Sequence, residues 1–338
     1  MTRITLRDVA ERAGVSYQTV SNIINNTKSV KPETRERVER VIREMGFVPN
    51  FTAKVLRQQK SMTLGCVFYE VADFDVEDPY RNMVQSAVSK ASKEANYSLL
   101  TYHVFEDNPN DLEELKVHLS QGRLDGLLFL SPSIPDTLIH ELSHWNRPIV
   151  LFDRFEASSS LPSVMPQYGD GIRQLVHHLV QKGRKCLAFV GGRREDYTQS
   201  GELRLSGFLE ATRELGVCLS SDYICHGDWS FEGGKQVFET LWNLNPRPDA
   251  ILSANDRMAI GLLSAAFEMG VRVPEDVSIT GFDDIEFSRY TNPPLTTVHV
   301  PYVEMVNHAV QTLVDMIDGQ DIHDHLWMPV SLRIRSSS

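Results

Sequence analysis

The sequence predicts an α/β protein in which a small all-helical headpiece precedes a two-lobed core, each lobe a parallel sheet flanked by helices. Residues 4–25 show two short helical periods joined by a glycine turn. From residue 63 onward, apolar runs of strand length alternate with helical stretches, as in a parallel sheet covered on both faces. A chain of 338 residues is long enough for two or three domains.

The first helical period begins with Thr5 followed three residues later by Asp8, which predicts a capping box. Gly14 supplies the left-handed residue that commonly ends a helix. Ser16 is placed to cap a second helix whose inner face contains apolar residues. The outward positions of this second helix are Tyr17, Gln18, Ser21, Asn22 and Asn25.

These outward residues are polar without forming a run of charge. Such side chains at the start of a second helix can hydrogen-bond base edges in a major groove, as in a helix-turn-helix. An ordinary small helical bundle with a neutral surface fits the same pattern. The pattern by itself leaves both interpretations open.

After the second helix, Val38, Val41, Ile42 and Met45 predict a third helix that closes a small core and stops at Gly46. Residues 51–60 are basic and too poor in apolar side chains to stand as a helix unaided. A flexible linker is the ordinary interpretation of such a segment.

Charge is divided unevenly along the chain. Residues 1–60 hold 12 Lys or Arg and 6 Asp or Glu, a net of +6, whereas the remainder holds 22 and 39, a net of −17. An acidic protein with a basic N-terminal segment suggests that only this segment meets nucleic acid.

The core shows two successive series of apolar runs and helical stretches, the second starting after Pro162. Two consecutive α/β lobes suggest a ligand cleft between them, because open parallel sheets bind ligands at the carboxyl ends of their strands. The strand-like runs are residues 64–71, 98–105, 126–131, 186–192, 223–228, 250–256 and 277–284.

Polar side chains stand at several of these predicted strand ends. Asp153, Asn255 and Asp283 each follow an apolar run. Arg204 begins the sequence motif RLSGF, and Trp229 comes just after a predicted strand. Carboxylates beside an arginine can bind vicinal hydroxyls, and an indole can stack on a sugar ring. The plainer interpretation is that such an Asp caps a turn and that a lone Trp is core.

Enzyme motifs are missing from the sequence. The segment FVGGRRED at 189–196 lacks the GxGxxG spacing of a dinucleotide-binding motif. No Walker loop or nucleophile elbow is present in the sequence. Asp283 and Asp284 are adjacent on one strand end and so point in different directions, which disfavours acid–base work. We therefore expect no catalytic residues and no cofactor.

Metal and membrane signals are also missing. Cys66, Cys186, Cys218 and Cys225 lack any metal-ligand spacing, so we expect thiols in a reducing compartment and no metal site. The N-terminus has no apolar signal region, and no apolar run approaches membrane length. The expected location is the cytoplasm, without a membrane partner.

Two segments resemble the DNA-binding headpiece of the lactose/galactose repressor family: TLRDVAERAGVSYQTVSNIIN at 5–25 and VKPETRERVERVIREMGFVPN at 30–50. This resemblance implies a headpiece at 1–48 in which Tyr17, Gln18 and Asn22 read bases of double-stranded DNA. Asn22 stands where the lactose repressor carries an arginine, which implies a different operator. The implied phosphate contacts are Thr5, Thr19, Ser21, Asn25 and Thr34.

The same resemblance makes residues 49–60 a hinge helix that orders when two subunits pair over the minor groove. Leu56 matches the leucine that family members insert between central base pairs, and Ala53 matches a neighbouring contact. Such a wedge unstacks a base step and kinks the duplex. A homodimer on a pseudo-palindromic operator is implied.

The resemblance extends over the core, which it identifies as periplasmic-binding-protein-like at 61–338. It implies an N-lobe at 61–161 and 294–324 and a C-lobe at 162–293 and 325–338, with 293–302 returning the chain to the first lobe. The family has Asn-Pro-Phe where this chain has Asp78-Pro79-Tyr80. The implied effector contacts are Tyr80, Asp153, Arg204, Trp229, Asn255 and Asp283.

The sequence thus predicts a homodimeric transcriptional repressor of a carbohydrate-utilisation operon, whose operator affinity changes when a small sugar-like effector binds between the lobes. An effector can act in this way only through different affinities for two core states. One alternative is a response to a purine-like corepressor or a protein co-effector. Another, a solute-binding transport component, is opposed by the headpiece.

Overall fold

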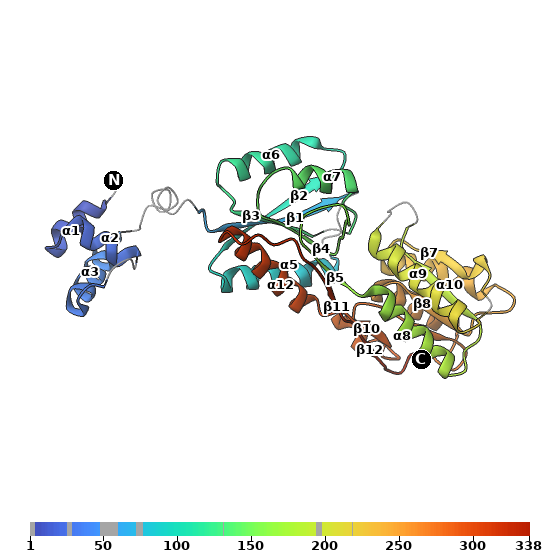
Figure 1. Ribbon diagram of the computed structural model, residues 1–338. Helices are drawn as coiled ribbons and strands as arrows, with labels where there is room; N and C mark the ends of the chain where they lie inside the picture. The colour runs from blue at the N-terminus through green and yellow to red at the C-terminus, as the bar shows by residue number, and fades with distance from the viewer. Residues whose placement is uncertain are drawn as a thin grey trace. The chain divides into compact units, whose positions relative to one another are not determined.

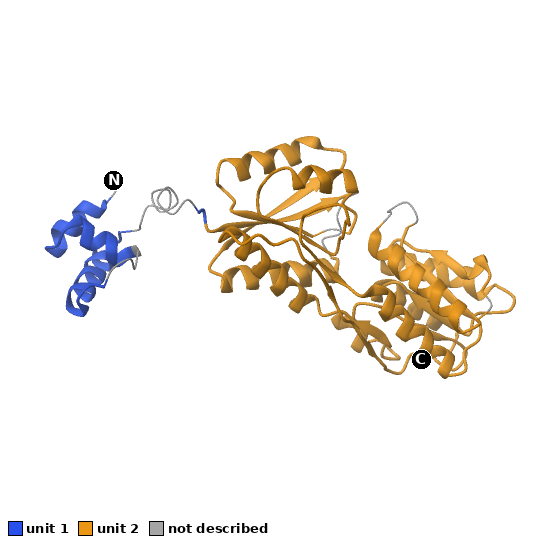
Figure 2. Ribbon diagram, viewed as in Figure 1, with its two compact units in different colours: residues 1–61 blue, residues 62–338 orange. Residues whose placement is uncertain are grey.

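The computed structural model describes residues 4–25, 29–47, 60–71, 77–130, 132–193, 198–217 and 219–338. These residues belong to two compact units, 1–61 and 62–338 (Figure 2). Ala53 and Leu56 of the predicted hinge, the side chain of Asn25, and Cys218 lie outside the described residues.

The first unit contains three helices, α1 (Leu6–Ala13), α2 (Tyr17–Asn25) and α3 (Pro32–Met45). The predicted capping box is present, since Thr5 and Asp8 each accept a hydrogen bond from the other's backbone amide. Gly14 is left-handed at φ 62°, and the amide of Thr19 donates to Ser16 Oγ at 3.0 Å. These local signals therefore set the helix ends as the sequence indicates.

One predicted orientation on α2 is wrong. Ser21 was expected to point outward, but it is only 7% exposed. Ser21 follows the fully buried Val20 and lies one turn before Ile24, which packs against the headpiece core. A small side chain at the edge of the buried face is covered by its neighbours, so Ser21 does not point outward as predicted.

The second unit begins with a six-stranded sheet in the order β11-β5-β4-β3-β1-β2, in which every neighbouring pair is parallel (Figure 1). Its strands are β1 (Thr63–Glu70), β2 (Ser98–Phe105), β3 (Gly126–Leu130), β4 (Ile149–Phe152), β5 (Ser163–Pro166) and β11 (His325–Met328). Its helices are α5 (Pro79–Glu94), α6 (Pro109–Ser120), α7 (Asp136–Ser143) and α12 (Tyr302–Ile317).

Both faces of this sheet are covered. Alternate residues of β1 enter different cores: Leu64 and Cys66 pack with α5 and α12, whereas Val67 and Tyr69 pack with α6 and α7. Figure 1 shows these two helix pairs on opposite faces. All residues of β1 are buried as a result, which explains why the strand reads as a continuous apolar run.

The second lobe has a four-stranded parallel sheet in the order β7-β6-β8-β9 and a two-stranded antiparallel ribbon of β10 and β12. The strands are β6 (Leu187–Gly191), β7 (Ile224–His226), β8 (Ala250–Ser253), β9 (Ser278–Thr280), β10 (Thr297–His299) and β12 (Ser331–Arg333). The helices are α8 (Tyr168–Gln181), α9 (Gln199–Glu214), α10 (Phe231–Trp242) and α11 (Asp256–Glu268), with short 3-10 turns at Ser221–Tyr223 and Glu286–Arg289.

The lobe boundaries differ from the predicted ones at 161/162, 293/294 and 324/325. β5 and β11 pair with each other at the edge of the first sheet, while β10 pairs with β12 in the second lobe. Each crossing therefore comes later in the chain than expected, because pairing between strands distant in sequence decides where a lobe ends. The expected return to the first lobe is present, since α12 packs against α5.

Candidate functional site

The candidate DNA-reading surface lies on α2. Tyr17 is 50% exposed, and Gln18 is exposed one position further along the helix. Gln18 Nε2 donates to Asn22 Oδ1 at 3.0 Å, so the two amides form one polar strip. Thr5 is exposed at the start of α1, whereas Thr19 and Thr34 are half-buried.

A cavity of about 410 Å³ lies in the second unit. Its walls come from the carboxyl ends of strands in both sheets, because residues shortly after the ends of β4, β7, β8 and β9 line it. The six predicted effector residues all line this cavity: Tyr80, Asp153, Arg204, Trp229, Asn255 and Asp283.

Arg204 and Asp283 form a buried ion pair in the cavity wall. Arg204 Nη2 lies 3.2 Å from Asp283 Oδ1, and the hydroxyl of Tyr302 donates to the same oxygen at 2.8 Å. The guanidinium carbon lies 4.0 Å from the centroid of the Tyr168 ring. Arg204 Nε is buried without a hydrogen-bond partner among the described residues.

Asp153 is bound by two tyrosines instead of a cation. Tyr168 donates its hydroxyl to Oδ1 at 2.5 Å, and Tyr80 donates to Oδ2 at 3.3 Å. Burial raises the pKa of Asp153 to about 6, against the opposing effects of these hydrogen bonds and of Arg204. Burial likewise raises the pKa of Asp283 to about 7, although Arg204 and Tyr302 counteract it.

Three cavity residues have left-handed backbones that side chains other than glycine rarely adopt. The φ angles are 61° at Asp153, 67° at Trp229 and 114° at Asp283. Such conformations persist only where surrounding structure enforces them, and they concentrate at ligand sites. Here they turn polar and aromatic side chains at strand ends toward the cavity.

Asn255 connects the Trp229 segment to α11. Its Oδ1 accepts from the Met258 amide at 2.9 Å and caps the helix, while its Nδ2 donates to the Trp229 carbonyl at 2.9 Å. A Cβ on Gly192 would lie 1.9 Å from the Trp229 ring, so the indole rests directly on the glycine backbone. Trp229 is thereby fixed with an aromatic surface in the cavity wall.

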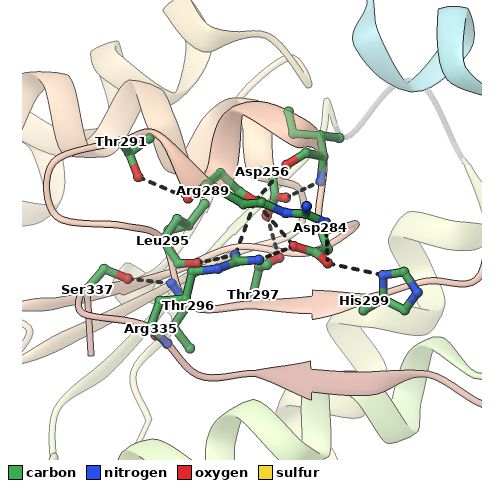
Figure 3. A network of polar contacts seen from close by, with 12 residues as sticks. Asp256, Asp284, Arg289, Thr291, Leu295, Thr296, Thr297, His299, Arg335 and Ser337 are labelled. Atoms are coloured by element: carbon green, nitrogen blue, oxygen red, sulfur yellow. Dashed lines mark hydrogen bonds and ion pairs between the residues drawn. The ribbon is translucent and has the colours of Figure 1, made fainter.

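The two adjacent aspartates diverge, as the sequence indicated. Asp284 turns away from Asp283 and pairs with Arg335, and His299 Nδ1 lies 3.1 Å from Asp284 Oδ2 (Figure 3). Asp256 binds the Thr297 hydroxyl at 2.5 Å and the Ile285 amide at 2.9 Å. These contacts fix the segment on both sides of Asp283.

Sequence reasoning missed two tyrosines of the site, Tyr168 and Tyr302. The position of each tyrosine could have marked it as a site residue, because both stand at the start of a helix near a strand end. Tyr168 is the first residue of α8, two residues after β5, and Tyr302 is the first residue of α12, after the crossover. Nothing in the sequence shows that their hydroxyls reach carboxylates of the opposite lobe.

Within the described ranges, no cluster of three or more His, Cys, Asp or Glu residues has metal-binding geometry. None of the described helices is both long and apolar enough to cross a membrane.

Comparisons with known proteins agree with this architecture. The model for "Bacterial regulatory proteins, lacI family" matches residues 5–50, and the "Periplasmic binding protein-like domain" matches residues 176–338. The HTH-type transcriptional repressor PurR of Erwinia tasmaniensis is 34% identical over 321 residues, covering 94% of this chain and 91% of PurR.

Two solved structures are similar over nearly the whole chain. The lac repressor dimer bound to operator and the anti-inducer ONPF has a TM-score of 0.86 and 29% identity, covering 99% of each chain. The regulator CelR in complex with cellobiose has a TM-score of 0.73 and 28% identity, covering 99% of this chain and 100% of CelR. The chain therefore belongs to the lacI family of bacterial regulatory proteins, which are DNA-binding transcriptional repressors, not enzymes, that act as dimers and respond to small-molecule effectors.

Proposed function

We propose that the effector of this repressor is a small neutral carbohydrate bound in the 410 Å³ cavity, and that the repressor controls an operon for carbohydrate use. The proposed contacts are Tyr80, Asp153, Arg204, Trp229, Asn255 and Asp283. The observation that carries the proposal is the buried Arg204–Asp283 pair beside the fixed indole of Trp229. An arginine and a carboxylate together bind adjacent hydroxyls, and an indole covers the apolar face of a sugar.

The charges around the cavity also favour a neutral ligand. Each of its arginines lies within 4 Å of a carboxylate: Arg81 with Glu70, Arg193 with Asp228, Arg204 with Asp283, and Arg257 with Asp78. An anionic ligand would have to displace one of these carboxylates. The CelR structure contains cellobiose, so a disaccharide is included among the ligands to test.

On DNA, we propose that the headpiece at 1–48 reads bases with Tyr17, Gln18 and Asn22. The exposure of Tyr17 and Gln18 on α2 and the Gln18–Asn22 hydrogen bond support this assignment. Thr5, Thr19 and Thr34 are the proposed phosphate contacts. The hinge at 49–60, with Ala53 and Leu56, and the contact of Asn25 depend on the family resemblance alone.

Gln18→Ala is expected to relax base preference at one operator position by about 1–3 kcal/mol, because a base contact is lost. Binding to a set of operator variants measures this preference. A uniform loss across all variants would assign Gln18 to the phosphate backbone instead.

The effector proposal is tested by fluorescence anisotropy of the full chain on DNA from upstream of its own gene. Salt is held fixed because phosphate contacts make affinity fall steeply with ionic strength. One member of a panel of mono- and disaccharides is expected to change operator affinity severalfold. Arg204→Ala should bind the operator as the wild type does and lose this change, since Arg204 belongs to the core unit.

Tight operator binding that no sugar alters, with a change caused by a purine base or a phosphosugar, would overturn the neutral-carbohydrate proposal. A sugar response that Arg204→Ala retains would remove Arg204 from the site.

A further inference from the structure

A second cavity, of about 340 Å³, lies in the second lobe next to the 410 Å³ cavity. Its described walls come from β6, β7, α9 and the 3-10 turn at Ser221–Tyr223. Three described residues line both cavities: Arg193, Thr198 and Trp229. Both volumes fall within the roughly 300–1,000 Å³ range of ligand pockets. The two cavities are therefore neighbours, and each is large enough for a ring-shaped ligand.

Trp229 forms the fixed part of this common wall. A Cβ on Gly192 would lie 1.9 Å from the indole ring, and one on Gly201 would lie 3.2 Å from it. A side chain at position 192 would therefore push the indole away. The backbone of Trp229 is held as well, since Asn255 Nδ2 donates to its carbonyl at 2.9 Å. The ring is thus fixed by glycine backbone while parts of it line each cavity.

His226 gives the second cavity a hydrogen-bonding group. Its Nδ1 lies 2.9 Å from the Gly192 carbonyl oxygen, and because a carbonyl oxygen only accepts, Nδ1 donates. The other nitrogen, Nε2, is then the acceptor of the neutral ring, and it has no hydrogen-bond partner within the described ranges. Ser221 and Glu202 also line the cavity, are exposed, and add a hydroxyl and a carboxylate. The second cavity therefore offers acceptors to the hydroxyl groups of a ligand.

Apolar side chains make up much of the remaining wall. Phe189, Leu205 and Ile224 line the cavity. Phe189 is only 1% exposed and stacks on Phe208 with the ring centroids 5.1 Å apart, so this part of the wall is rigid. A sugar ring has apolar C–H faces and hydroxyls around its edge, which match apolar walls that carry a few acceptors.

Arg193 forms the outer part of the common wall. Its Nη2 lies 3.8 Å from Asp228 Oδ2, and the two side chains are 54% and 33% exposed. Ion pairs that are this exposed add little stability. Arg193 can therefore turn aside for a ligand that extends past Trp229 from one cavity into the other. Because its charge is paired, Arg193 also gives no preference for an anion.

We propose that the effector is a neutral disaccharide or longer oligosaccharide whose second ring occupies the 340 Å³ cavity. The first ring lies in the 410 Å³ cavity, the glycosidic bond passes Trp229 beside Arg193, and His226 Nε2 accepts from a hydroxyl of the second ring. This inference rests on the proposed carbohydrate effector and adds its length. Two rings remove more apolar surface from water than one, so the longer sugar should act at a lower concentration.

The length of the effector is tested by anisotropy of the full chain on DNA from upstream of its own gene, at fixed salt. The ligands are neutral monosaccharides and the di- and trisaccharides built from them. The readout is the sugar concentration that gives half of the change in operator affinity. In the wild type, one disaccharide should act at a roughly tenfold lower concentration than its component monosaccharides.

Leu205→Trp places an indole in the second cavity. The half-maximal concentration of the active disaccharide should rise roughly tenfold, because the second ring is excluded, while that of its monosaccharide should not change. Leu205→Ala enlarges the same cavity and should keep the disaccharide response, which separates blocking of the cavity from a disturbed helix. Leu209→Trp is the matched control, since Leu209 lies one turn later on α9, is 41% exposed and lines neither cavity.

Equal potency of a monosaccharide and its disaccharides in the wild type would overturn the second ring. So would an unchanged disaccharide response in Leu205→Trp, or the same loss in Leu205→Ala or Leu209→Trp. A wild type that responds to no sugar would overturn the carbohydrate effector itself, and the second ring with it. The two failures are distinguishable, because the first is seen only where a sugar response exists.

Discussion

At the scale of single residues, burial decides the chemistry of the cavity. Asp153 is 3% exposed and accepts from two tyrosine hydroxyls in place of a cation, whereas Asp283 accepts from both Arg204 and the hydroxyl of Tyr302. Both carboxyls have raised pKa values because water is excluded from them. A ligand that offers hydroxyl donors replaces that lost water, so the same burial that weakens ionisation favours a donor-rich ligand.

Asp153 should make stability depend on pH. Its pKa is about 6 in the folded protein and about 4 in an unfolded chain, so the folded state binds more protons between these values. The free energy of unfolding therefore falls as pH rises through this window, by about 3 kcal/mol for a shift of this size. Asp153→Asn should remove this part of the decline, as measured by urea unfolding from pH 4 to pH 7.

Asp283 still titrates in the Asp153→Asn variant, so some decline toward pH 7 should remain. Parallel stability curves for the wild type and Asp153→Asn would show that Asp153 is not the group responsible.

At the scale of elements, α11 owes its position to close contact with α10. A Cβ on Gly261 would lie 1.9 Å from the Phe231 carbonyl oxygen, and one on Gly234 would lie 2.1 Å from the Met258 carbonyl oxygen. The two helix backbones therefore touch, as only glycine allows. Because Asn255 and Arg257 stand at the start of α11, this contact also sets the cavity wall.

Gly261→Ala should destabilise the core by about 1–3 kcal/mol, because the added methyl group forces the helices apart. It should also weaken binding of any ligand found for the cavity, through displacement of the start of α11. Chemical unfolding measures the first effect, with Ser264→Ala at an exposed position of the same helix as the control. Equal stability of the two variants would mean that the helices adjust without cost.

At the scale of the whole core unit, the last residues of the chain hold the crossover segment in the second lobe. Arg335 pairs with Asp284, whose side chain is only 3% exposed, and donates to the Leu295 carbonyl at 2.7 Å. Ser337 Oγ donates to the Ile279 carbonyl at 2.6 Å and accepts from the Thr296 amide at 2.8 Å. The chain end therefore ties β9 to the segment that leads back to the first lobe.

Arg335→Met should cost about 3–5 kcal/mol of stability, because a buried carboxylate loses its principal partner. Arg333→Met is the control, since Arg333 is exposed on β12 a short distance away. Guanidinium unfolding of the full chain compares the two. A loss no larger than that of Arg333→Met would show that His299 and Arg289 compensate for the missing charge.

The sequence by itself determined the local structure and indicated several of the residues that line the cavity. The cap at Thr5, the turn at Gly14 and the alternation of strands and helices depend on neighbouring residues, so they can be read in order along the chain. Asp153, Asn255 and Asp283 were recognisable because parallel strands bring their carboxyl ends to one edge of a sheet.

Only the tertiary structure decided the contacts between distant segments. The pairing of β5 with β11 set the lobe boundary, Ser21 became buried at the edge of a packed face, and Tyr168 and Tyr302 reached carboxylates of the opposite lobe. The Asp78–Arg257 pair likewise joins residues far apart in the sequence. Such contacts depend on how the lobes are placed in space, and no local pattern of residue types encodes that placement.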